Sequence, residues 1–187
     1  MKLALAISLL LICAGCVTTD DKGNPIGKST LETDLVVDSY GRIVGRPTRL
    51  MPPDKIIING DKPTEREIRL LGVEGLPEKE APNTYAECQE WMARFLAAED
   101  EIFIKPSLDS RLEARVIFGL VYLRAYDEET QRPVPNGYVL VNMAMLSKGL
   151  VRIRNLNEIE DSRLRTAMQE AETKAKREKL GIWARSP

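Results

Sequence analysis

The sequence IRLLGVEGLPE, residues 68–78, decides how the rest of this chain is interpreted. Its apolar residues predict a buried strand, with Arg69 at the start and Glu74 and Glu78 just past the end. An arginine can grip a phosphate through paired hydrogen bonds, while carboxylates can hold a divalent cation or position a water. The chain has no histidine, so acid, base and metal chemistry must fall to carboxylates, lysine, tyrosine or water. The stretch therefore predicts a candidate site at a strand end.

The N-terminus has the pattern of an export signal. Lys2 precedes a short apolar run that ends in small residues and a cysteine, Ala14-Gly15-Cys16, and the run is too short to span a bilayer comfortably. It resembles the lipobox of bacterial lipoproteins, which implies removal of residues 1–15 and acylation of Cys16. Val17 after the cysteine then implies the outer membrane, on its periplasmic face, if the host is Gram-negative. The alternative is an ordinary signal peptide cut elsewhere.

Length and composition predict one domain on a tether. Residues 16–40 are polar with little periodicity, as in a flexible linker, and residues 41–187 fit a single domain. The net charge of −1 argues against a strongly electrostatic nucleic-acid binder. Local arginine clusters are interpreted by default as solvated surface; they are Arg42, Arg46 and Arg49, then Arg152 and Arg154, then Arg163 and Arg165. Once Cys13 is removed and Cys16 is acylated, Cys88 has no disulfide partner, and its pattern fits a buried small hydrophobe.

Hydrophobic periodicity predicts a small α+β domain with a β-barrel. Residues 59–61, Asn-Gly-Asp, favour a hairpin turn. Thr84 and Glu87 have the spacing of a capping box at the start of one helix, and a last helix is predicted from about Glu158 to Gly181. A short helix is predicted at 142–148. The predicted strands are 42–50, 55–58, 67–73, 101–104, 115–125, 138–140 and 150–153.

Three motifs in order resemble the staphylococcal nuclease (thermonuclease) family. They are Arg69-Leu-Leu-Gly-Val73 with Pro77-Glu78, the segment 141–150 (VNMAMLSKGL), and the run 170–183 that ends in Gly-Ile-Trp. The resemblance covers roughly residues 42–184. It implies a five-stranded OB-type barrel with three helices, and calcium-dependent hydrolysis of phosphodiesters in DNA or RNA. It also implies nucleic acid as the partner; no protein partner is expected, and the chain is predicted to be a monomer.

The same resemblance assigns roles to individual residues. Arg69 matches an arginine that contacts the scissile phosphate, and Arg115 matches a second one, with Arg111 and Arg124 as nearby competitors for that role. Glu78 matches a glutamate proposed to act as general base or to position water. Asp54 and Glu74 take the places of calcium ligands, and Ca²⁺ prefers such oxygen donors.

Several departures keep a second hypothesis open. The motif D-G-D-T of the family is Pro52-Pro53-Asp54-Lys55 here, a glutamate replaces the aspartate at position 74, and one extra residue precedes Pro77. Asn155 and Asn157 stand where the family places two tyrosines. The alternative to a nuclease is therefore a non-catalytic OB-type domain that binds nucleic acid, a peptide or an envelope component.

Overall fold

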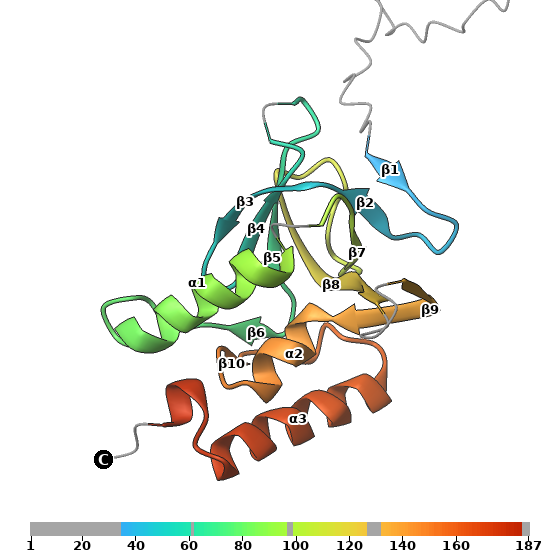
Figure 1. Cartoon of the computed structure of the whole chain (residues 1–187). Helices are drawn as coiled ribbons and strands as arrows, with labels where there is room; N and C mark the ends of the chain where they lie inside the picture. The colour runs from blue at the N-terminus through green and yellow to red at the C-terminus, as the bar shows by residue number, and fades with distance from the viewer. Residues whose placement is uncertain (1–34, 61, 97–98, 127–131, 185–187) are drawn as a thin grey trace, which may run out of the picture. The chain divides into compact units, whose positions relative to one another are not determined.

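The computed structural model describes residues 35–60, 62–96, 99–126 and 132–184. The predicted signal peptide, Cys16 and most of the predicted linker lie outside the described residues, as do Asp61 and nearly all of the polar loop predicted at 127–132. Every element described below lies within one compact unit, residues 33–187 (Figure 1). Within the described ranges, no helix has the length and hydrophobicity needed to cross a membrane.

Most strands belong to one sheet that closes on itself. Its order is β1-β2-β7-β8-β5-β4-β3, with β9 paired to β8. The β5–β8 pair is parallel and the others are antiparallel. Only Arg46 separates β2 from β3, so the order begins and ends on nearly the same stretch of chain, as in a barrel. The strands are β1 (Val36–Val37), β2 (Ile43–Gly45), β3 (Pro47–Met51), β4 (Lys55–Ile58), β5 (Arg66–Leu70), β7 (Ile102–Pro106), β8 (Val116–Tyr126) and β9 (Pro133–Leu140).

This α+β, OB-type architecture agrees with the prediction. The resemblance implied a five-stranded barrel, and the main sheet of the described residues contains eight strand segments. A second sheet joins β6 (Val73–Glu74) to β10 (Arg152–Ile153). The predicted strand 67–73 is therefore split, because Gly72 adopts a positive φ of 81° between β5 and β6.

Alternation along the strands separates the core from the face that carries the candidate site. On β4 and β5, Ile56, Ile58 and Ile68 are fully buried. Lys55 and Arg69 alternate with them and are paired across the two strands. Because successive strand side chains point to opposite faces, the charged residues lie on the outer face of the barrel. Cys88 of α1 (Pro82–Leu96) is fully buried as predicted, and burial raises the pKa of its thiol to about 12.

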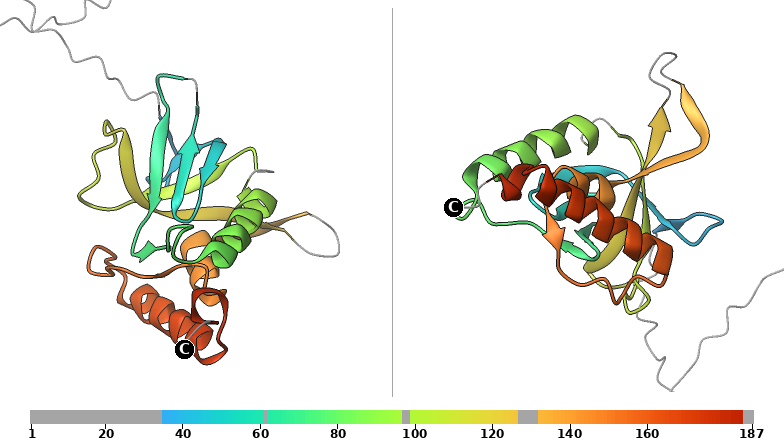
Figure 2. Two further views of the ribbon diagram at one scale, coloured as in Figure 1. Left: turned by 90° about the vertical axis from the view of Figure 1, so that its left-hand side faces the viewer. Right: turned by 90° about the horizontal axis from the view of Figure 1, so that it is seen from below.

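Among the described residues, three α-helices cover the barrel, as predicted, although the first and the last begin several residues from the expected positions. Figure 1 shows α1 against the barrel, with α2 (Val141–Ser147) and α3 (Ser162–Arg177) beneath it, and Figure 2 shows α3 along that underside. The chain then forms a short 3₁₀ helix, η1 (Gly181–Trp183).

The two helix starts have simple physical reasons. α1 begins at Pro82, whose fixed φ and missing N–H suit a first helical position, so Thr84 lies inside the helix and is buried there. α3 begins after Asp161 rather than near Glu158. The Asp161 carboxylate accepts hydrogen bonds from the backbone N–H groups of Arg163 and Leu164, at 2.8 and 3.2 Å, which makes it the N-cap.

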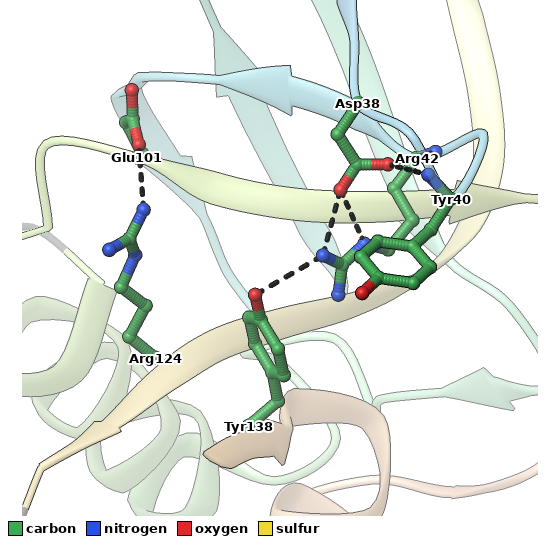
Figure 3. Close-up of polar contacts among 6 residues, drawn as sticks. All are labelled: Asp38, Tyr40, Arg42, Glu101, Arg124 and Tyr138. Atoms are coloured by element: carbon green, nitrogen blue, oxygen red, sulfur yellow. Dashed lines mark hydrogen bonds and ion pairs between the residues drawn. The ribbon is translucent and has the colours of Figure 1, made fainter. Parts of the chain in front are cut away.

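Residues 38–42 join the outer side of the barrel to β9 (Figure 3). Asp38 forms a 2.7 Å ion pair with Arg42, whose guanidinium also donates to the Tyr138 hydroxyl at 3.2 Å. The guanidinium carbon lies 4.7 Å from the Phe103 ring centroid and 4.5 Å from that of Tyr138. The linker is predicted to extend to residue 40; within that range β1 pairs with β2 in the main sheet, and Asp38 pairs with Arg42.

Candidate functional site

Asp54 and Arg69 line one hollow on the outer face of the barrel, with a volume of about 180 Å³. The β4–β5 register pairs Lys55 with Arg69, and the backbone N–H of Leu70 donates to the Asp54 carbonyl at 3.0 Å. These contacts fix the two candidate residues side by side. The remaining lining comes from β5, the turn after it, β8 and the segment after β10; it consists of Leu70, Leu71, Gly72, Val73, Phe118, Arg154, Asn155 and Glu158.

The Arg69 guanidinium contacts two neighbouring side chains, Glu67 and Phe118, and is otherwise partly exposed. Its Nε is 2.8 Å from a carboxylate oxygen of Glu67, two residues earlier on the same face of β5. Its guanidinium carbon lies 5.8 Å from the Phe118 ring centroid, in keeping with the parallel register that pairs Arg69 with Phe118. Among the described residues, its two terminal nitrogens have no hydrogen-bond partner, and the side chain is 36% exposed. These donors are the ones available to an anion.

Asp54 is a partly buried carboxylate with positive neighbours. Burial is the main cause that raises the pKa of its carboxyl above the ordinary value, and the Glu74 carboxylate adds slightly to it. The positive charges of Lys55 and Arg69 act in the opposite direction without cancelling the effect of burial. Desolvation disfavours the ionised form, so a cation placed beside this carboxylate would offset part of that cost.

Glu74 lies beside this hollow but already has cationic partners. Its Oε1 accepts from the Arg152 Nε at 2.9 Å and is 2.8 Å from Arg152 Nη2, and its Oε2 is 3.8 Å from the Arg154 Nε. The β6–β10 register pairs Glu74 directly with Arg152. The next residue, Gly75, passes so close to Pro53 that an added Cβ would lie 2.1 Å from the proline Cβ. This close approach places β6 next to Asp54.

The structure does not bring Glu78 into the hollow. Glu78 lies in the turn between β6 and α1, is exposed, and has no hydrogen bond or ion pair within the described residues. It is absent from the residues that line the hollow. Its assignment as a base or water-positioning group stays a prediction from the resemblance.

Arg115 also lies outside the hollow. It precedes β8, its side chain is 84% exposed, and it is 3.6 Å from a carboxylate oxygen of Glu65. With Glu67 it helps to line a second hollow on the barrel surface. On β8, the residue that the register places beside Arg69 is Phe118. The predicted second phosphate-binding role of Arg115 therefore finds no support in its position.

Sequence reasoning missed Arg154 as part of the site. It was interpreted as one member of a solvated arginine cluster, yet it lines the hollow together with Arg69. The backbone N–H of Arg154 donates to the Gly72 carbonyl at 3.0 Å, which fixes the segment after β10 against the turn after β5. The available signal was the order of the motifs, since the Gly-Leu segment at 149–150 leads directly into Arg152 and Arg154.

The residues do not form a ready calcium site. Ca²⁺ takes six to eight oxygen ligands, and among the residues that the structure describes no group of three or more Cys, Asp or Glu side chains is placed to hold a metal ion. Asp54 offers one carboxylate, while both oxygens of Glu74 face guanidinium groups. The predicted calcium ligands Asp54 and Glu74 are neighbours, but they do not fit the family cofactor as they stand.

The fold and the hollow together define a small OB-type barrel with an arginine-lined surface site. A family model for staphylococcal nuclease homologues matches residues 67–185, which is more than half of the chain, and the chain belongs to that family. No curated protein matches the chain. Family membership supports a nuclease-type or nucleic-acid-binding function.

Proposed function

We propose that this chain binds a phosphodiester group of nucleic acid in the hollow between Arg69 and Arg154. The observation that carries the proposal is that these two arginines, from β5 and from the segment after β10, line the same hollow. Guanidinium groups match phosphate oxygens through paired donors, and the terminal nitrogens of Arg69 have no hydrogen-bond partner among the described residues. Phe118 adds an apolar ring beside Arg69, against which a sugar or base can pack.

A binding experiment tests this function. Fluorescence anisotropy of a labelled single-stranded oligonucleotide is measured with the full chain and with Arg69→Ala, over a range of salt concentrations. Loss of a charge-assisted phosphate contact is expected to weaken binding about tenfold or more and to reduce the salt slope by about 1. Arg177→Ala is the control, because Arg177 is 75% exposed at the end of α3. Equal affinity for both variants and the unchanged chain would contradict the proposal.

The second candidate function is hydrolysis of the bound phosphodiester with a divalent cation, Ca²⁺ in the first instance. It is favoured by Asp54, a partly buried carboxylate in the same hollow as Arg69. If the chain has this second function, DNA or RNA is cleaved in CaCl₂, and cleavage is abolished by EDTA, by Arg69→Ala and by Glu78→Gln. Gel analysis of the same oligonucleotide makes the test. Binding without cleavage across Ca²⁺, Mg²⁺ and Mn²⁺ would leave the chain as a binding domain.

We also propose that the chain is tethered to the cell envelope as a monomer through a lipid on Cys16. The support is the sequence Ala14-Gly15-Cys16 after a short apolar run. The wild-type chain is expected in the membrane fraction of cells, labelled by a fatty-acid analogue, whereas Cys16→Ser should lose the label. A labelled Cys16→Ser chain would contradict lipidation at this residue.

A further inference from the structure

The surroundings of Glu74 do not suit a ligand of Ca²⁺, the cofactor that the family resemblance implies. A carboxylate that serves as a calcium ligand must present an oxygen to the ion, yet here Oε1 and Oε2 each face an arginine. The Arg152 contacts, at 2.8 and 2.9 Å, have the length of charge-assisted hydrogen bonds. Arg154 is the looser partner at 3.8 Å, and its side chain is 63% exposed.

Arg152 and Arg154 contact the same carboxylate, Glu74, but have different roles. Arg152 is paired with Glu74 across the β6–β10 ladder, so it neutralises this carboxylate as a fixed part of the structure. Arg154 is anchored by its backbone at Gly72; its Nε is 3.8 Å from Oε2 of Glu74, and the residue also lines the hollow that Arg69 lines. A phosphate in the hollow would therefore compete with Glu74 for Arg154.

We propose that guanidinium groups take the place of the metal ion in this chain, so that the hollow is a metal-independent phosphate site restrained by Glu74. Arg152 supplies the charge that offsets Glu74, and Arg69 with Arg154 binds the phosphate of a nucleic acid. This rests on the proposed function and adds the cofactor requirement and the role of Glu74. No bond is made or broken in this step; Arg154 exchanges one anionic partner for another.

The sign of the Glu74→Gln effect distinguishes this arrangement from a calcium site. The variant keeps the shape of the side chain but removes the charge that holds Arg154. With the full chain and a labelled oligonucleotide in EDTA, we expect Glu74→Gln to bind about threefold more tightly, the scale of one partly exposed ion pair. Arg154→Gln should bind more weakly than the unchanged chain. A calcium ligand would behave in the opposite way, since its removal would weaken binding.

Glu101→Gln is the matched control. Glu101 is 3.4 Å from Arg124 in another partly exposed pair (Figure 3), so its removal changes the net charge by the same amount away from the hollow. Tighter binding by Glu74→Gln than by Glu101→Gln therefore reports a local effect. Circular dichroism shows whether each variant is folded. If Glu74→Gln does not fold, Arg154→Gln tests the site independently.

The remaining outcomes overturn the inference in distinguishable ways. Calcium titration by calorimetry is expected to give no binding heat, and CaCl₂ in place of EDTA should leave oligonucleotide affinity unchanged. Binding that requires Ca²⁺ overturns metal independence, and a Glu74→Gln variant that binds more weakly or equally well overturns the restraint by Glu74. The proposed function stands in both cases. Failure of the unchanged chain to bind the oligonucleotide with or without Ca²⁺ removes the proposed function and the inference with it.

Discussion

Asn142 is the residue that ties the hollow to the helices behind it. Its side chain is fully buried. The amide oxygen accepts from the Val121 N–H at 3.0 Å, and the amide nitrogen donates to the carbonyls of Leu71 at 2.9 Å and Gly119 at 3.4 Å. Leu71 directly follows β5 and precedes Gly72, and Gly119 follows Phe118 on β8, so one amide links α2 to the end of β5 and to β8. This explains a structural need for asparagine in the segment 141–150.

Replacement of Asn142 by alanine is expected to destabilise the chain strongly. A buried polar group left without its partner costs about 1–3 kcal/mol, and this change orphans the Val121 N–H and weakens the bonding of two carbonyls. We expect the free energy of unfolding in urea to fall by about 2 kcal/mol or more. Asn157→Ala is the control, because Asn157 is exposed and should change stability by less than about 0.5 kcal/mol.

Replacement of Asp54 by asparagine is expected to stabilise the chain, in contrast to the loss expected for Asn142→Ala. Its pKa is higher in the folded than in the unfolded chain because of burial, so the folded state holds the proton to a higher pH. Stability from this group is therefore full at low pH and is lost as pH rises through the folded pKa. We expect Asp54→Asn to be more stable than the unchanged chain at pH 7, with the difference disappearing in acid.

Urea unfolding at several pH values measures this difference. A destabilised Asp54→Asn at pH 7 would show that the ionised carboxylate is favourable in the fold, contrary to its desolvation. A stabilised variant that binds or cleaves nucleic acid less well would place Asp54 among residues retained for function at a cost in stability.

At the scale of elements, sequence patterns predicted strands far better than their pairing. The predicted strand 55–58 coincides with β4, because four residues bounded by turn signals leave little choice. The parallel β5–β8 pair joins segments on either side of α1, and its register follows from packing that no local pattern records. A slip of one residue moves every side chain to the other face. No local pattern therefore predicted that Phe118 would lie beside Arg69.

The contact between α2 and η1 is another element-scale feature without a local sequence signal beyond two glycines. Gly149, at φ 68°, and Gly181, at φ 50°, pack backbone to backbone, and the Ile182 N–H donates to the Gly149 carbonyl at 2.9 Å. An added Cβ at Gly149 would lie 2.3 Å from the Leu180 carbonyl oxygen. The contact holds the chain end after α3 against the end of α2.

Gly149→Ala and Gly41→Ala form a matched pair that separates steric clash from backbone strain. Both glycines have positive φ, but a Cβ at Gly41 would meet nothing within 4 Å. Gly41→Ala should cost only the left-handed strain, about 1–2 kcal/mol. Gly149→Ala should cost clearly more in urea unfolding, because a backbone carbonyl must also move. Equal losses would show that the α2–η1 contact adds nothing to stability.

At the scale of the whole molecule, the barrel holds together segments that are far apart in the chain. β2 and β3 close it. The Arg42 guanidinium joins the turn after β1 to the Phe103 ring on β7 and to the Tyr138 ring on β9, the second of which Figure 3 shows. Composition predicted residues 16–40 as linker because they are polar. The short apolar stretch at Leu35 and β1 was missed, since two strand residues give no periodicity.

The folded unit should therefore begin before residue 41. Leu35 is buried in the core, and Asp38 neutralises Arg42, whose side chain is only 13% exposed. A chain that starts at Thr33 is expected to retain the unfolding free energy of the full chain. A chain that starts at Gly41 is expected to lose about 1.5–3 kcal/mol of unfolding free energy from Leu35 alone. It also leaves the largely covered Arg42 guanidinium without its carboxylate, which adds to the loss.

Urea unfolding of the full chain, the chain from Thr33 and the chain from Gly41 measures these differences. Arg42→Ala in the chain from Thr33 separates the effect of the ion pair from that of apolar burial. If the chain from Gly41 were as stable as the chain from Thr33, β1 and Asp38 would belong to the linker after all.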